Sequence, residues 1–394
     1  MKLLLTLRWA VLCVSAALFA ACGGSDGDTN IGTSSSSSSL SGTVATGAPM
    51  KSAEVTIKDR NGKSTTAKTG DAGKYTADIT GMTPPLIAKA VGKVKGADKT
   101  YYALLQSLAS SGVLNISPVT DAMAQTQPDG KKPNQLFDSP TNMQQMTEVD
   151  FEKLVKAQQQ LAKALKNFYA AMGVDTSFDV TSSPFDADHE GMDALLDCLE
   201  YDDSTKKLSV KSSCNNGAEQ DAFDPGSFDP NADLDGLTEL PAPPAGLQDF
   251  ISESVKAVDT LMAALNLATN GEGGGIAVST AFNAALASDY LEDDGDTNTS
   301  RSGFISDWVD SYNNGLRLEI VLNYVAGFVN DETAADDDTL DMCATAIRTE
   351  NGGTPGFSPM GISFKKQSGA WKIATPSASV QAASACGKGF DIDE

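Results

Sequence analysis

The acidic stretch 229–236 carries oxygen ligands at a spacing that calcium loops use. Amide and carboxylate side chains alternate at Asn231, Asp233 and Asp235, and a glycine that permits a tight turn follows. Ca²⁺ takes about six to eight such oxygen ligands. An EF-hand register that starts at Asn231 puts Ala242 where a bidentate glutamate belongs. The stretch therefore predicts either a Ca²⁺ site outside the EF-hand pattern or a solvated acidic linker, and the linker is the simpler interpretation.

His189 is the single histidine of the chain, which limits the kinds of catalysis that the sequence supports. A serine-histidine-aspartate triad needs a histidine that exchanges protons with the nucleophile. Asp188 and Glu190 flank His189 and raise its basicity, but a basic histidine alone is not a catalyst. We interpret His189 as a residue that fixes the turn before a short helix over 192–197, and we expect that the protein is not an enzyme.

Residues 1–21 have the composition of a cleavable export signal. Two basic residues near the start precede an apolar run over 9–21, and small residues lead into Cys22. The run is shorter than the ~20 residues that a permanent membrane-spanning helix needs. We therefore expect a signal peptide over 1–21 and a diacylglycerol on the Cys22 thiol, in a lipid anchor that includes palmitate. An ordinary secretory signal cut nearby is the alternative.

The segment 22–39 resembles the tether of Gram-negative bacterial lipoproteins. Gly23 follows the cysteine, and a block of serines at 34–39 gives the segment too little apolar surface to fold. In such lipoproteins an aspartate after the lipidated cysteine favours retention in the inner membrane. Gly23 at that position therefore implies a location at the outer membrane.

The mature chain is strongly acidic. Cleavage removes Lys2 and Arg8 from 29 basic residues, which leaves 27 against 52 acidic residues and a formal charge of −25. This charge argues against nucleic acid and anionic lipid surfaces as partners, since both need a basic patch. The lipid anchor is then the expected contact with the membrane.

The cysteines beyond Cys22 are even in number, as expected in an oxidising compartment. They are Cys198, Cys214, Cys343 and Cys386. We favour the pairs Cys198–Cys214 and Cys343–Cys386, because each pair lies within one expected structural unit. A metal site is the weaker alternative, since the sequence contains no CxxC motif.

The unit 40–117 has the pattern of a β-sandwich. Residues 53–58 alternate between apolar and polar, and Asn61-Gly62 lies between two such runs as in a hairpin turn. Short strands separated by regular turns are typical of an all-β sandwich. The succession of the motifs at 41–44, 47–50, 53–57 and 69–75, with Gly73 in a turn before Tyr75, resembles the carboxypeptidase regulatory-like domain. That resemblance implies a transthyretin-like fold, which occurs in exported proteins of many functions.

The unit 118–214 is expected to be mainly helical with one β-hairpin. A long amphipathic helix is predicted over 148–172, and a hairpin around 203–206 is expected to be closed by a Cys198–Cys214 disulfide. The phrase 183–197 resembles a recurrent element of exported lipoproteins that carry the same regulatory-like module, and that resemblance brings no activity with it.

The last two segments are an acidic, proline-rich linker over 215–246 and an α+β domain over 247–394. Helices come first in this domain and strands after them. The closing hairpin around Trp371 resembles that of NTF2-like domains, which implies a curved sheet with helices in its concavity.

The whole chain is therefore expected to be a multi-domain lipoprotein of the cell envelope that acts as a binding or interaction module. The expected ligands are proteins or glycans, with Ca²⁺ as the one cofactor to consider. The alternative is a hydrolase in the C-terminal domain that uses carboxylates or a bound metal.

Overall fold

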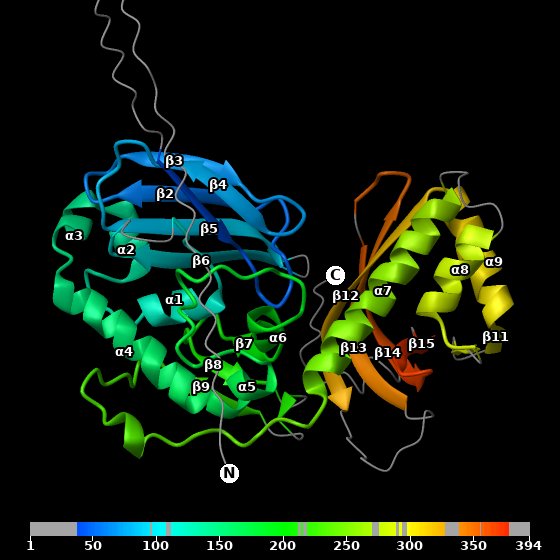
Figure 1. The fold of residues 1–394 in the computed structure, drawn as a ribbon. Coiled ribbons are helices and arrows are strands. Elements are labelled where there is room, and N and C mark those ends of the chain that lie inside the picture. Colours follow the sequence, from blue (N-terminus) through cyan, green and yellow to red (C-terminus); the bar gives the residue numbers. More distant parts are fainter. Residues whose placement is uncertain are drawn as a thin grey trace, which may run out of the picture. The chain divides into compact units, whose positions relative to one another are not determined.

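The computed structural model describes residues 38–94, 97–107, 112–211, 214–215, 219–269, 276–288, 291–293, 298–327, 339–354 and 356–377 (Figure 1). Within these residues, no helix is both long and apolar enough to cross a membrane.

Two antiparallel sheets form the N-terminal sandwich. The smaller sheet pairs β1 (Ser39–Thr43) with β4 (Lys74–Asp78). The larger has the order β3-β2-β5-β6, with β2 at Glu54–Asp59, β3 at Ser64–Lys68, β5 at Leu86–Val94 and β6 at Ala97–Leu105. The expected alternation is confirmed in β2, where Val55 and Ile57 are buried between the sheets. Tyr75 lies in the same core and donates its hydroxyl hydrogen to the Leu114 carbonyl at 2.6 Å.

A helical layer covers the outer face of β5 and β6. Ile87 and Leu104 point out of the sandwich and pack with Leu136, Phe137 and Phe151 of the helices. The helices are α1 (Pro118–Ala124), α2 (Pro133–Asp138), α3 (Pro140–Gln144), α4 (Glu148–Ala164) and α5 (Lys166–Ala171). The sandwich and the helical region thus share apolar contacts.

The long helix predicted over 148–172 is two helices. The backbone leaves helical geometry at Leu165, with φ −91° and ψ 13°, between α4 and α5. Leu161, Leu165 and Phe168 of the predicted apolar stripe are buried. Val155, which falls on the same face by its sequence spacing, is 57% exposed.

A small sheet lies beyond α6 (Met192–Asp197). It has the order β7-β8-β9, with β7 at Leu199–Tyr201, β8 at Leu208–Val210 and β9 at Gln220–Phe223. A Cys198–Cys214 disulfide closes the β7–β8 hairpin, with the two Cα atoms 5.6 Å apart. The structure thus joins the two cysteines that the sequence analysis paired.

The described part of the segment 215–246 is not a free linker. It contributes β9 to the small sheet and a single 3₁₀ turn, η2 (Leu234–Gly236). Phe223 and Leu240 are buried in the core of the helical region, and the Leu240 N–H donates to the Ala164 carbonyl at 2.8 Å. The few apolar residues in this acidic stretch therefore attach it to the core of the helical region. Its overall composition did not predict this packing.

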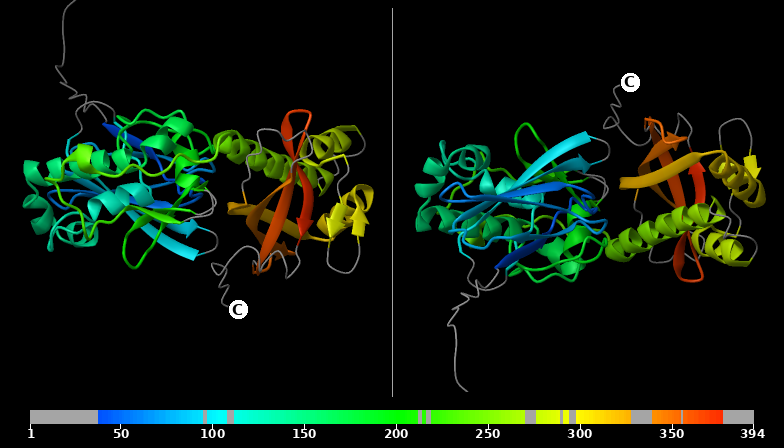
Figure 2. Two further views of the ribbon diagram at one scale, coloured as in Figure 1. Left: turned by 90° about the horizontal axis from the view of Figure 1, so that it is seen from below. Right: turned by 90° about the horizontal axis from the view of Figure 1, so that it is seen from above.

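The C-terminal domain packs three helices against one four-stranded antiparallel sheet (Figures 1 and 2). Its elements are α7 (Leu247–Thr269), α8 (Ile276–Ala285), β10 (Leu291–Asp293), β11 (Asn298–Ser300), α9 (Arg301–Asn313), β12 (Leu316–Gly327), β13 (Thr339–Glu350), β14 (Gly356–Gln367) and β15 (Ala370–Ser377). The sheet runs β12-β13-β14-β15, and α7 contacts both of its edge strands. Phe250 of α7 meets Trp371 and Phe364 edge-on at the centre of this core.

Candidate functional site

Three side chains from α6 and from the turn before it converge on one point. Asp193 and Asp197 lie four residues apart within α6, a spacing that stacks their side chains on one side of the helix, and His189 lies in the turn that precedes the helix. The Nδ1 atom of His189 lies 2.8 Å from Asp197 Oδ2 and 3.9 Å from Asp193 Oδ2. His189 has a positive φ of 62°, and its backbone N–H donates to Asp193 Oδ2 at 2.8 Å. Few residue types other than glycine adopt a positive φ, and here this conformation places the imidazole beside Asp193 and Asp197.

Burial and neighbouring charges shift the pKa values of Asp193 and His189 in this cluster. The side chain of Asp193 is 0% exposed, and its Oδ1 atom has no hydrogen-bond partner among the groups that the structure describes. Burial and the charge of Asp197 raise the pKa of Asp193 to about 7, against the opposing effect of His189. Burial would lower the pKa of His189, but the hydrogen bond and charge of Asp197, with the charges of Asp193 and Asp259, raise it to about 9.

The loop that carries His189 is fastened to two other parts of the fold. On the sandwich side, Thr43 Oγ1 donates to the Phe185 carbonyl at 2.7 Å, and Lys74 pairs with Asp186 at 2.8 Å. On the other side, Lys256 of α7 pairs with Glu190 at 2.8 Å. Within the loop, the His189 N–H donates to Asp193 Oδ2, so the backbone of His189 helps to hold the turn before α6.

Gly47 of the sandwich lies against Asp197. A Cβ atom added at Gly47, whose φ is +86°, would stand 2.5 Å from Asp197 Oδ1. From the other side, the half-buried Lys211 donates its Nζ hydrogen to the Asp197 carbonyl at 2.5 Å. The position of Asp197 is therefore set by residues far from it in the sequence.

The two carboxylates and the imidazole of this cluster can bind a cation or a proton. Within the described part of the chain, the hydrogen-bond partner of the His189 ring is the Asp197 carboxylate, and no serine or cysteine is bonded to that ring. A hydrolytic nucleophile would need such a bond. Sequence reasoning missed Asp193 and Asp197, although their positions four and eight residues after His189 were visible in the sequence.

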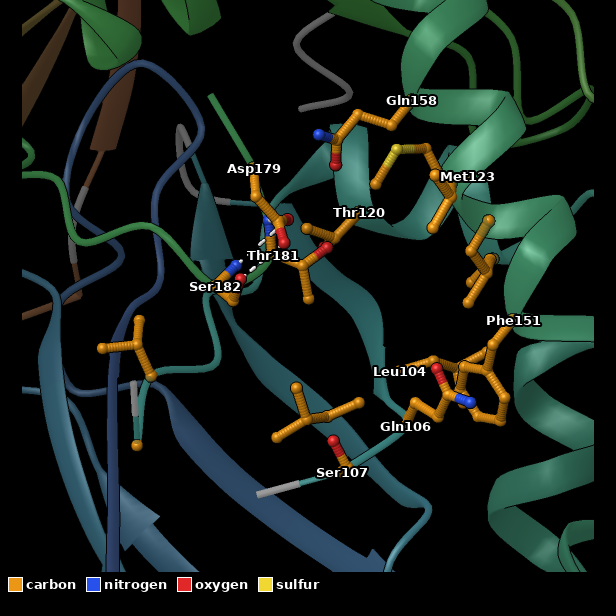
Figure 3. Close-up of a pocket in the computed structure, with 16 residues that line it drawn as sticks. Leu104, Gln106, Ser107, Thr120, Met123, Phe151, Gln158, Asp179, Thr181 and Ser182 are labelled. Atoms are coloured by element: carbon orange, nitrogen blue, oxygen red, sulfur yellow. Dashed lines mark hydrogen bonds between the residues drawn. The ribbon is translucent and has the colours of Figure 1, made fainter. Parts of the chain in front are cut away.

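A separate cavity of about 230 Å³ lies where the end of β6 faces α1, α4 and the loop 179–182 (Figure 3). Its wall combines apolar side chains with uncharged amides and hydroxyls. Representative lining residues are Leu104, Gln106, Ser107, Met123, Phe151, Gln158 and Thr181. Among the described residues of the wall, Asp179 is the one that carries a charge, and its oxygens accept hydrogen bonds from the backbones of Thr181 and Ser182 and from the Ser182 hydroxyl.

The residues predicted for calcium do not form a cluster of this kind. Asn231, Asp233 and Asp235 are exposed, and Asp233 Oδ1 accepts a hydrogen bond from the Asp235 N–H at 3.1 Å. Glu239, the nearest glutamate, pairs instead with Lys163 at 2.7 Å. Among the described histidines, cysteines and acids, the one trio at metal-binding distance is that of α6.

Two other predicted sites fall partly or wholly outside the described residues. Cys22 and Cys386 lie outside them. Cys343 lies in β13, where the structure describes the backbone but not the side chain. The lipidation and the Cys343–Cys386 disulfide stay predictions.

No protein-family model matches this chain, and no curated protein matches it. Similar solved structures include an NTF2-like protein with a cystatin-like fold from Novosphingobium aromaticivorans, 15% identical, covering 35% of this chain and 92% of that chain, with a TM-score of 0.24. A second is an LEH-like epoxide hydrolase of M. tuberculosis, 14% identical, covering 32% and 81%, with a TM-score of 0.22. A third is an NTF2-like protein of unknown function from Pseudomonas putida, 13% identical, covering 32% and 83%, with a TM-score of 0.22.

Two of these neighbours are described as NTF2-like. At these identities and TM-scores, the likeness says nothing about what this chain binds or converts.

Proposed function

We propose that this chain is an exported, lipid-anchored protein of the outer membrane that acts as a binding module and not as an enzyme. Two observations support export. The apolar leader ends in small residues before Cys22. The Cys198–Cys214 disulfide is of a kind that persists in oxidising compartments and is rare in the cytosol.

The cavity beside β6 is the proposed binding site, and its wall is the observation that carries the proposal. Uncharged amides and hydroxyls alternate there with apolar side chains, and the oxygens of its one carboxylate, Asp179, accept hydrogen bonds within the loop. Such a wall suits a neutral ligand that is itself part hydroxyl and part apolar. It offers no acid and base pair that would act on that ligand.

A neutral sugar unit fits this chemistry. The cavity is smaller than the ~300–1,000 Å³ of pockets that enclose drug-sized ligands, so it is suited to one small ligand or to the end unit of a larger glycan. Phe151 provides an apolar surface for the ring, and Gln106, Ser107 and Gln158 provide hydrogen-bonding groups for its hydroxyls.

The test uses the mature chain from Gly23 onward and ligand-observed NMR with a panel of neutral saccharides. Val155 and Val149 both lie on α4 and are 57% and 58% exposed, but only Val155 lines the cavity. Val155→Trp should narrow the cavity and abolish saturation transfer to a bound sugar, and Val149→Trp should leave it unchanged. Equal effects of the two substitutions, or no transfer to any sugar, would refute this site. Conversion of a bound sugar would favour the hydrolase alternative.

A further inference from the structure

The cluster at the start of α6 has the dimensions of a metal's first coordination shell. One atom from each of His189, Asp193 and Asp197 lies within 4.8 Å of the other two. Ligands about 2.0–2.2 Å from a tetrahedral Zn²⁺ are about 3.3–3.6 Å from one another. The distances of 2.8 Å and 3.9 Å from His189 Nδ1 to the two carboxylates lie on either side of that range.

An unpartnered buried atom provides independent evidence that a ligand is expected here. The Asp193 side chain is fully buried, yet its Oδ1 atom accepts no hydrogen bond from any described group. Buried polar atoms in folded proteins almost always have a partner, because an unpaired one has lost its hydration without compensation. A cation between Asp193 and its two neighbours would compensate for that loss.

The charge and the ligand types select the class of cation. Two carboxylates and one neutral imidazole carry two negative charges, which a divalent ion neutralises. An imidazole ligand favours Zn²⁺ over Ca²⁺ and Mg²⁺, which prefer shells of oxygen atoms. The side chains of His189 and Asp197 are 16% and 21% exposed, so an ion and a water ligand have access from solvent.

We propose that His189, Asp193 and Asp197 bind one Zn²⁺ ion. The ion takes the place of the proton that His189 shares with Asp197, and that proton leaves to solvent. Glu190 and Phe185 in the same loop contact α7 and the sandwich, so the bound ion would stabilise the point where these parts meet. This site is distinct from the proposed sugar cavity, since none of its residues lines that cavity.

The single histidine allows a direct test of the site. In the full mature chain, made without a histidine tag, the imidazole nitrogen signals in a long-range ¹H–¹⁵N NMR spectrum all belong to His189. One equivalent of Zn²⁺ should move the Nδ1 signal, and elemental analysis after dialysis should find about one Zn²⁺ per chain. Unmoved imidazole signals, or no retained Zn²⁺, would overturn the proposal.

Substitutions locate the ligands. Asp193→Asn keeps the shape of the side chain, and His189→Gln replaces the ring with an uncharged amide. Each should weaken Zn²⁺ binding by about 100-fold, because loss of a residue that only supports a metal ligand already weakens binding by up to about 100-fold. Asp235→Asn, in the exposed acidic segment, is the matched control and should bind as the unaltered chain does. Loss of Zn²⁺ in Asp235→Asn but not in Asp193→Asn would place the ion elsewhere and overturn the assignment. Because Asp193→Asn could also disturb folding, circular dichroism of the metal-free variant must match that of the unaltered chain.

Discussion

At the scale of single residues, Asp150 shows how this acidic chain keeps a charge in its interior. The side chain is buried at the start of α4 and accepts hydrogen bonds from Lys131 Nζ at 2.7 Å and from the Thr147 N–H at 2.9 Å. Burial alone would raise the pKa of Asp150, but these hydrogen bonds outweigh it and lower that pKa to about 2.

The ionised Asp150 therefore stabilises the fold at neutral pH. Because the folded pKa lies below the unfolded one, this stabilisation is complete above about pH 4 and is lost as the pH falls through about 2. Asp150→Asn should lower the free energy of unfolding at pH 7 by about 2 kcal/mol, because Lys131 loses its charged partner. Urea unfolding measures this loss. The exposed Asp129→Asn is the control, with an expected change within about 0.5 kcal/mol.

Asp121 responds to pH in the opposite direction. Burial raises its pKa to about 6, although a hydrogen bond from the Tyr201 hydroxyl opposes the rise. Between about pH 4 and 6 the folded state binds a proton that the unfolded state has lost, so stability falls as the pH rises through this range, by up to about 3 kcal/mol.

Asp121→Asn keeps an oxygen for the Tyr201 hydroxyl and removes the titration. The variant should therefore lose less stability than the unaltered chain between pH 4 and 7, as measured by urea unfolding at intervals of pH. Parallel stability curves for the two proteins would contradict the assigned pKa shift.

At the scale of elements, the sequence predicted what local pattern determines. The alternation over 53–58 gave the strand β2, and the spacing of Cys198 and Cys214 gave the closed hairpin. The break at Leu165 and the packing of Leu240 depend on contacts between distant segments, which neither periodicity nor composition contains. The α6 cluster is intermediate, because its spacing was visible but the burial of Asp193 depends on the surrounding fold.

The Cys198–Cys214 disulfide has an element-scale effect that can be measured. It joins cysteines 16 residues apart and restricts the unfolded chain over that loop. Replacing both cysteines by alanine should lower the free energy of unfolding by about 3 kcal/mol, as expected for a loop of this length. Equal urea midpoints for the variant and the unaltered chain would show that the disulfide adds no stability.

At the scale of the whole molecule, the negative charge of the proposed mature chain opposes membrane attachment, and the proposed lipid anchor provides it. In the proposed lipoprotein, the formal charge of −25 on the mature chain would repel anionic lipid surfaces, so we do not expect the protein's own surface to provide membrane attachment. In the proposed lipoprotein, attachment depends entirely on the lipid at Cys22. The segment 22–39 then sets how far the folded part extends from the membrane.

Substitution of the lipidated cysteine tests this division of roles in a Gram-negative host. The unaltered chain should sediment with the membrane fraction and stay there in high salt, since salt screens charge but does not weaken an acyl anchor. Cys22→Ser should move the protein to the soluble fraction. Cys13→Ser, in the expected signal peptide, removes a thiol that the mature protein does not keep and should change nothing. If Cys22→Ser still sediments with the membrane after a salt wash, attachment rests on another part of the chain, and the tether has a different role.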